Sequence, residues 1–128
     1  MRELIAAATE ARLRAYAPYS DFLVGAALLT SSGKIYAGCN IENSSYSLTC
    51  CAERVATASA IADGHQNFEA LAVVSVNGSY PCGACRQFLN EFTPDLLIII
   101  ADTHGKISAE TTLSALYPSA FSPDSLEP

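Results

Sequence analysis

The amino-acid sequence predicts a three-layer α/β/α fold, in which a mixed sheet of about five strands has helices on both faces. Strand-length apolar runs alternate with helix-like segments in the order α-β-β-α-β-α-β-β-α. The runs at residues 68–76 and 96–100 are predominantly apolar, which is typical of strands that are covered on both faces. The 128 residues have the usual size of one domain. We find no internal repeat or linker and predict a single domain over residues 1–128.

The beginning of the chain is predicted to form a helix and then a hairpin. Apolar residues recur at helical spacing over residues 2–15, and this pattern stops before Pro18. Residues 22–29 and 34–40 have the composition of strands, and the Ser- and Gly-containing residues 30–33 supply the turn between them.

The middle of the chain is predicted to form a helix, a strand and a second helix. Residues 41–50 are polar and rich in capping side chains, so we expect a loop that leads into a helix over residues 51–62. A buried strand follows at residues 68–76. Pro81 suits the first position of the next helix, which we place at residues 82–91.

The end of the chain adds two strands and a short helix. We expect a buried strand at residues 96–100, a weak fifth strand at residues 106–108 and a helix at residues 111–116. Residues 118–128 are rich in Pro and Ser, and we expect them to lie on the surface.

The composition limits the classes of partner. The formal net charge is −6 at pH 7, whereas nucleic-acid binding needs Lys and Arg to replace phosphate counterions. No apolar run approaches the length of a membrane span, and the first residues do not resemble a signal peptide. Five cysteines in such a chain favour a metal site or free thiols over disulfides. We therefore predict a soluble, cytoplasmic protein that binds neither nucleic acid nor a membrane.

Three cysteines and one glutamate form the pattern that points to chemistry. Cys82 and Cys85 are three residues apart and share one face of a predicted helix, whereas Cys51 and Glu53 are only two apart. Cys51 should therefore lie at the start of its helix, so that both side chains can reach one place. Three thiolates and an open position for water are typical of catalytic zinc, and C-x-E with P-C-x-x-C is typical of base deaminases. Arg54 either offsets the thiolate charge or is a solvated surface residue.

Two other interpretations of the cysteines remain open. A structural zinc site usually has four ligands, and Cys39 or Cys50 could supply the fourth. Cys50 is adjacent to Cys51, which is awkward for one tetrahedron, and Cys39 lies in a predicted strand. A C-x-x-C redox pair without metal is the other interpretation. The combined C-A-E and P-C-x-x-C pattern favours catalytic zinc over both.

Five segments, in order, resemble those of the short, three-cysteine type of cytidine deaminase. They are residues 17–28 (APYSDFLVGAAL), 38–43 (GCNIEN), 51–54 (CAER), 81–87 (PCGACRQ) and 116–121 (LYPSAF). The resemblance implies a hydrolase that converts cytidine and 2′-deoxycytidine to uridine and 2′-deoxyuridine in pyrimidine salvage and releases ammonia. It also implies a homotetramer with active sites at the subunit contacts.

The resemblance also implies roles for individual residues. Cys51, Cys82 and Cys85 would bind one zinc ion per subunit. Glu53 would transfer protons, and Arg54 would temper the thiolate charge. The implied substrate contacts are Phe22 beside the pyrimidine, Asn40 and Glu42 on the ribose, the Ala52 N–H on the base carbonyl, the Tyr80 carbonyl at the leaving amino group, and Phe121 in a neighbouring subunit's site.

Two features of the sequence bear on the substrate. Asn40 and Glu42 are alternate residues of a predicted strand and therefore share a face, as two groups that bind one sugar would need. Tyr80 stands where a small residue is expected, and the connection over residues 76–81 is short for this family. Both departures affect the expected shape of the pocket.

Three alternative functions remain open. A deaminase of a cytosine-containing nucleoside antibiotic such as blasticidin S would share the cysteine pattern but would not need Asn40 and Glu42. An editing enzyme that acts on polynucleotides is disfavoured by the acidic charge and by Cys51 in place of His. A non-catalytic zinc-binding module is disfavoured by Glu53 and by a ligand count of three.

Overall fold

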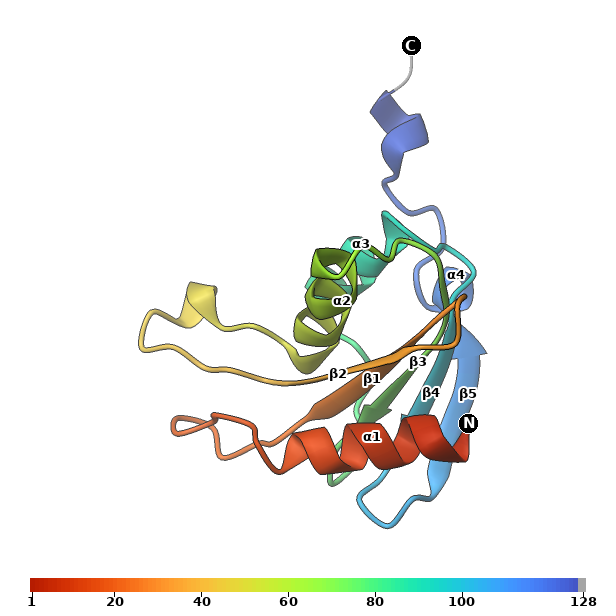
Figure 1. Cartoon of the computed structure of the whole chain (residues 1–128). Coiled ribbons are helices and arrows are strands. Elements are labelled where there is room, and N and C mark those ends of the chain that lie inside the picture. The colour runs from red at the N-terminus through yellow and green to blue at the C-terminus, as the bar shows by residue number, and fades with distance from the viewer. Residues whose placement is uncertain (127–128) are drawn as a thin grey trace.

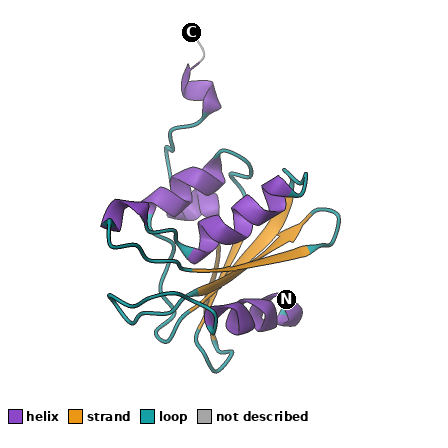
Figure 2. Ribbon diagram, turned by 60° about the vertical axis from the view of Figure 1, so that its left-hand side comes forward, coloured by secondary structure: helices purple, strands orange, loops and turns teal. Residues whose placement is uncertain are grey.

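Five strands form one mixed sheet between two helical layers in the computed structural model, which describes residues 1–126 (Figures 1 and 2). The helices are α1 (Arg2–Arg12), α2 (Ala52–Ala62), α3 (Gly83–Asn90) and α4 (Leu113–Leu116). The strands are β1 (Gly25–Thr30), β2 (Ile35–Cys39), β3 (Phe68–Val74), β4 (Leu97–Ala101) and β5 (Ile107–Thr112). The predicted fold class and the order of the elements are confirmed.

The sheet has the strand order β2-β1-β3-β4-β5. β3 and β4 are parallel, and the other neighbouring pairs are antiparallel. A parallel pair needs a crossover connection, which α3 supplies. Helix α1 covers one face of the sheet, and α2 and α3 cover the other (Figure 2).

Alternating side chains of the central strands supply the two cores. In β4, Ile99 packs on the α1 side, whereas Ile98 and Ile100 pack on the side of α2 and α3. All three are fully buried, and each such side chain contributes roughly 1.5–3 kcal/mol of hydrophobic stabilisation. Burial on both faces explains why these strands have apolar runs rather than an alternating pattern.

Two glycines let a helix approach the sheet closely. A Cβ atom at Gly25 would lie 1.9 Å from the Ala8 carbonyl oxygen of α1. A Cβ atom at Gly38 would lie 2.5 Å from the Ala56 nitrogen and 2.8 Å from the Ala52 oxygen of α2. Gly38 therefore determines how closely the first turn of α2 lies against β2.

The first helix and the first strand are both shorter than predicted. Helix α1 ends at Arg12 because the next amides bond three residues back, as in a 3₁₀ turn. Strand β1 begins at Gly25, and just before it Phe22 and Val24 bond to the Asn40 side chain. The Asn40 Oδ1 atom accepts from the Val24 N–H, and its Nδ2 atom donates to the Phe22 carbonyl.

Three later boundaries also differ. β3 ends at Val74, before a turn over residues 75–79, and β5 is longer than predicted, so α4 begins at Leu113. Pro81 does not occupy the first helical position, because Cys82 is the N-cap and Gly83 begins α3. The proline instead lies just before the cap.

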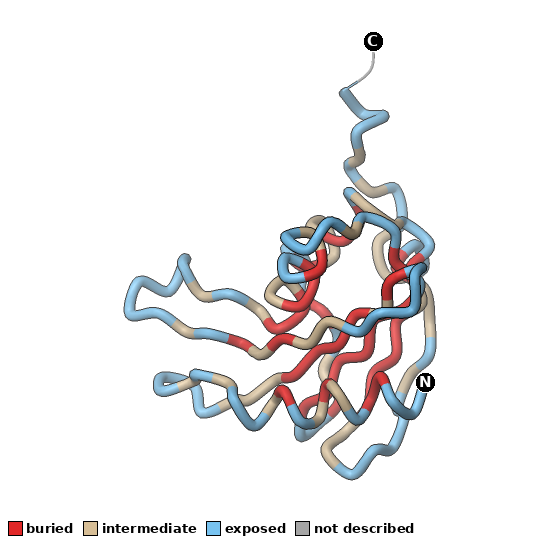
Figure 3. Tube along the Cα trace, viewed as in Figure 1, coloured by how far each residue is buried: buried red, intermediate tan, exposed pale blue. Residues whose placement is uncertain are grey.

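The C-terminal segment projects away from the layers (Figure 1). Residues 118–126 are exposed or half-buried, as predicted for the tail (Figure 3). The remainder of that prediction, residues 127–128, lies outside the described residues. No helix within residues 1–126 combines the length and the apolar character that a membrane crossing requires.

The close packing of α2 against β2 at Gly38 can be tested by a substitution that adds one methyl group. We expect Gly38→Ala to lower the free energy of unfolding by about 1–3 kcal/mol, because the added Cβ overlaps the α2 backbone. Gly83→Ala is the matched control, since a Cβ there meets no heavy atom of the described chain within 4 Å. Urea unfolding would measure both variants, and equal stability of the two would contradict the packing argument.

Candidate active site

Three cysteine side chains meet where two helices begin. Cys51 is the N-cap of α2, Cys82 is the N-cap of α3, and Cys85 lies in the first turn of α3. Helix N-termini favour negative charge and lower the pKa of thiols. The predicted position of Cys51 at a helix start is confirmed.

The spacing of the sulfur atoms fits a single zinc ion. All three Sγ atoms lie within 4.8 Å of one another. The Cys51–Cys82 separation is 3.8 Å, and the Cys82–Cys85 separation is 3.5 Å. A tetrahedral zinc ion with bonds of about 2.3 Å would hold its sulfur ligands about 3.8 Å apart.

The other two cysteines are not part of this cluster within the described part of the chain. Cys39 lies at the end of β2, and the exposed Cys50 thiol faces the Leu48 carbonyl oxygen at 3.7 Å. Neither belongs to the group of three that could share a metal ion. The structure therefore does not support a structural zinc site closed by a fourth cysteine.

The thiols of the cluster share protons unequally. A hydrogen bond from Cys85, together with the Arg54 guanidinium, lowers the pKa of Cys51 to about 5, although burial opposes the shift. The same hydrogen bond and burial raise the pKa of Cys85. One sulfur is thus readily a thiolate, which is the form that binds a metal ion.

Arg54 lies against the cluster rather than in solvent. Its Nη2 atom donates to the Thr49 carbonyl at 3.0 Å and faces the Cys51 Sγ atom at 3.8 Å. Its Nε atom is buried and has no hydrogen-bond partner within the described residues. This geometry supports the prediction that Arg54 offsets thiolate charge.

Glu53 lies in the first turn of α2 and is only 5% exposed. Burial raises its pKa to about 7, and the neighbouring Cys51 adds to the shift. A cation held by the cysteines would act in the opposite direction, because it favours the charged carboxylate. Burial and a bound cation thus act on this carboxyl group in opposite directions, and its position beside the cluster suits proton transfer.

A cavity of about 280 Å³ is lined by Glu53 and by two of the clustered cysteines, Cys51 and Cys82. Most of the predicted substrate residues line it, and the lining set is Ser20, Phe22, Val24, Asn40, Glu42, Thr49, Cys51, Ala52, Glu53, Val73, Ser79, Tyr80 and Cys82. The fold thus brings the residues that precede β1 and those that follow β2 next to the starts of α2 and α3.

Asn40 and Glu42 have a second role in the structure. The Asn40 side chain, 9% exposed, bonds to the backbone of Phe22 and Val24. The Glu42 carboxylate accepts hydrogen bonds from the loop that contains Ser20. Both side chains therefore fix the wall of the cavity as well as line it.

Phe121 does not line this cavity in the single chain. Its side chain is 56% exposed. Its carbonyl oxygen accepts hydrogen bonds from Gln87 at 3.0 Å and from Asn90 at 3.3 Å, which tie the tail to α3. Its predicted place in a neighbouring subunit's site remains a prediction.

Five lining residues were not among the predicted site residues. Val24 and Val73 have the sequence pattern of core positions, so no signal distinguishes them. Ser20, Thr49 and Ser79 are loop residues that each lie two or fewer positions from a predicted site residue. That proximity to Phe22, Cys51 and Tyr80 is the signal that could have identified them.

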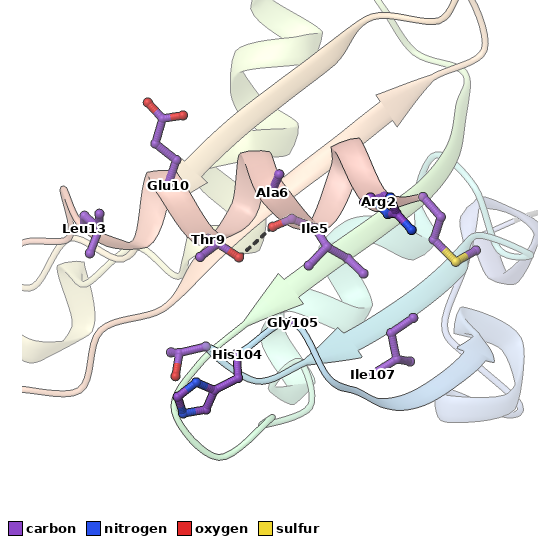
Figure 4. Close-up of a pocket in the computed structure, with 11 residues that line it drawn as sticks. Arg2, Ile5, Ala6, Thr9, Glu10, Leu13, His104, Gly105 and Ile107 are labelled. Atoms are coloured by element: carbon purple, nitrogen blue, oxygen red, sulfur yellow. Dashed lines mark hydrogen bonds between the residues drawn. The ribbon is translucent and has the colours of Figure 1, made fainter.

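A larger cavity, of about 650 Å³, lies between α1 and the turn that joins β4 to β5 (Figure 4). Its walls are mainly aliphatic parts of Met1, Ile5, Leu13 and Ile107, with His104 at the turn. It contains no cysteine and none of the predicted site residues. Size alone therefore does not identify the functional site.

The chain is similar to proteins named cytidine deaminase along most of its length. A family model described as the cytidine and deoxycytidylate deaminase zinc-binding region matches residues 1–101. The chain is 50% identical to the cytidine deaminase of Sporosarcina psychrophila, over 98% of this chain and 94% of that protein. It is 45% identical to the cytidine deaminase of Halalkalibacterium halodurans, over 96% and 95% of the two chains.

Two further similarities bear on structure and substrate. The crystal structure of cytidine deaminase from Burkholderia pseudomallei matches with a TM-score of 0.89 and 48% identity, over 93% of this chain and 97% of that chain. The blasticidin-S deaminase of Bacillus cereus is 32% identical over 91% of this chain and 88% of that protein.

The metal cluster predicts different effects for different cysteines. Purified protein should contain one zinc ion per chain, and Cys85→Ala should lose most of it because Cys85 is one of the three clustered thiols. Cys50→Ala is the matched control and should keep its zinc, since Cys50 lies outside the cluster. Elemental analysis would measure the metal content, and loss of zinc from Cys50→Ala would reject the three-cysteine assignment.

Proposed function

The chain belongs to the cytidine and deoxycytidylate deaminase family, and we propose that it hydrolyses cytidine and 2′-deoxycytidine to uridine and 2′-deoxyuridine with release of ammonia. The observation that carries this proposal is a buried carboxylate, Glu53, that lines one cavity together with Cys51 and Cys82, two of the three clustered thiols. Cys51, Cys82 and Cys85 would hold the zinc ion, leaving Glu53 free for proton transfer.

The zinc ion, when bound, would supply a Lewis acid that lowers the pKa of water toward neutral pH. The chain's own contribution is to position the ligands and to handle the protons. Arg54 offsets part of the thiolate charge, which would otherwise weaken that Lewis acid.

Glu53 can carry each proton that the reaction moves. Its carboxylate accepts a proton from the attacking water as the water oxygen bonds to C4, and it delivers that proton to N3 of the ring. A second transfer takes the proton of the new hydroxyl group to the exocyclic nitrogen. Ammonia then leaves as the C4 carbonyl forms, and the proton on N3 remains in the product.

The remaining lining residues would recognise the nucleoside. Ala52 is the first residue of α2, where backbone N–H groups have no partner within the helix, so its N–H can meet the base carbonyl. Phe22 would flank the pyrimidine, and the Tyr80 carbonyl would face the leaving amino group. Asn40 and Glu42 would hold the ribose.

We further propose that the protein is a homotetramer. Exposed apolar and aromatic side chains on the loops beside the cavity support a contact with other subunits, and they are Tyr16, Tyr19, Ile41, Tyr46 and Leu48. Phe121 on the projecting tail would reach a neighbouring subunit's cavity. A cytoplasmic location and a role in pyrimidine salvage complete the proposal.

Deamination of a nucleoside antibiotic such as blasticidin S is the second candidate. The 32% identical relative named for that antibiotic supports it. Asn40 and Glu42 both line the cavity, and this favours a substrate with a ribose over the antibiotic.

The deciding experiment follows the loss of cytidine absorbance with purified protein. We expect turnover of cytidine that disappears after zinc is chelated and returns when zinc is restored. Faster turnover of blasticidin S than of cytidine would favour the second candidate. Bound zinc without deamination of any nucleoside would instead support a non-catalytic zinc module.

The proposed role of Glu53 predicts a specific loss. Glu53→Gln keeps the size of the side chain but cannot accept a proton, so kcat for cytidine should fall by roughly 10²–10⁴-fold. Zinc content should be unchanged, because Glu53 is not a proposed ligand. Glu69→Gln, at an exposed position of β3, is the matched control and should keep full activity. Retained turnover in Glu53→Gln would reject the assignment.

The charge-offset role of Arg54 predicts a milder defect. Arg54→Ala should remain folded and bind zinc, with kcat lowered roughly tenfold because a charge-assisted contact to Cys51 is lost. Arg14→Ala removes a mostly exposed guanidinium from the turn that follows α1 and serves as the comparison. Steady-state kinetics would distinguish the two, and equal rates would show that Arg54 has only a structural role.

A further inference from the structure

Two loops extend together beyond the edge of the sheet (Figure 1). We call residues 13–24 the first arm and residues 40–50 the second arm. The Tyr16 amide donates to the Asn40 carbonyl at 3.0 Å, and the Glu42 amide donates to the Tyr16 carbonyl at 2.8 Å. The rings of Tyr19 and Tyr46 meet edge to face, with centroids 6.0 Å apart. The arms therefore form one unit beside the cavity.

The Glu42 carboxylate is the main polar junction between the arms. Its Oε1 atom accepts from the Tyr19 amide at 2.9 Å and from the Ser20 amide at 3.2 Å. Its Oε2 atom accepts from the Ser20 hydroxyl. The Ser20 hydroxyl in turn accepts from the Phe22 amide at 3.1 Å. Ser20 thus connects the Glu42 carboxylate to the backbone N–H of Phe22, the residue proposed to flank the base.

These bonds hold a flexible side chain in one orientation. A glutamate loses side-chain entropy when it is ordered, and here the side chain is already ordered by hydrogen-bond donors from the first arm before a ligand binds. A carboxylate has about four acceptor positions, of which three are occupied by these donors. Ser20 and Glu42 both line the cavity, and the carboxylate retains acceptor capacity for a further hydrogen bond.

The same contacts favour the ionised form of Glu42. The Ser20 hydroxyl is the largest of the influences that hold the pKa of Glu42 below its usual value. An ionised carboxylate only accepts hydrogen bonds, which suits a partner that donates, such as a sugar hydroxyl.

We propose that Ser20 is a positioning residue for sugar recognition: its hydroxyl fixes the Glu42 carboxylate so that the carboxylate accepts a hydrogen bond from a ribose hydroxyl. The inference rests on the proposed function and adds to it a residue that determines specificity. Ser20 acts through Glu42 and does not take part in the chemistry at C4.

The test compares two substrates that differ only in their sugar hydroxyls. Ser20→Ala should lower kcat/KM for cytidine roughly tenfold, mainly through KM, because one charge-assisted hydrogen bond is lost from Glu42. For 2′,3′-dideoxycytidine, kcat/KM should change by less than about twofold. This substrate lacks the 2′ and 3′ hydroxyl groups that would donate a hydrogen bond to Glu42. Ser20→Thr keeps a hydroxyl and should restore discrimination. Ser31→Ala, in the β1–β2 turn, is the control and should behave as the wild type.

A second arm of the experiment asks whether Ser20 acts through Glu42. In a Glu42→Ala background, adding Ser20→Ala should cause little further loss with cytidine, because coupled residues give non-additive effects. Equal losses for both substrates, or additive losses in the double variant, would overturn the proposal. These outcomes leave cytidine turnover by the wild type in place, whereas failure of the proposed function would abolish turnover of both substrates.

Discussion

The convergence of two helix N-termini on one point is the constraint on which the site depends. α2 is held against β2 by the close approach at Gly38, and α3 is the crossover between the parallel strands β3 and β4. These two placements bring Cys51 and Cys82 to within 3.8 Å. Unpaired N–H groups at both helix starts favour the negative charge that thiolates introduce. The packing of the sheet and the chemistry of the metal cluster are therefore consequences of the same geometry.

The site concentrates groups that would destabilise an ordinary core. Glu53 is buried beside the Cys51 thiol, which ionises readily, and burial disfavours the charged form of a carboxylate. Arg54 supplies one compensating charge from the same helix. A zinc ion held by three thiolates would supply two further positive charges, so metal binding and stability of this region should be coupled. The rule that core positions are apolar therefore fails at this site, as it commonly does at functional sites.

The sequence predicted what depends on short-range pattern. The order of strands and helices followed from apolar periodicity, and the spacing of Cys51 and Glu53 required the cysteine at a helix start, as the structure has it. Contacts between distant residues could not be predicted in this way. The bonds from the Asn40 side chain to Phe22 and Val24 lie just before β1, and no local sequence pattern predicts them. The Ser20–Glu42 contact joins residues 22 positions apart, so the spacing of residues in the sequence does not predict it either.

Chemistry and recognition are built on different parts of the fold. The proposed proton carrier and metal ligands lie at the ends of packed helices, whereas the proposed sugar contacts lie on arms that expose Tyr16, Tyr46 and Leu48. Segments with few buried side chains open locally at lower cost than a packed core. The hydrogen bonds of Asn40 and Glu42 therefore contribute to the order of the arms as well as to the lining of the cavity. It follows that changes in the arms should alter substrate discrimination while leaving the sheet and the metal cluster intact.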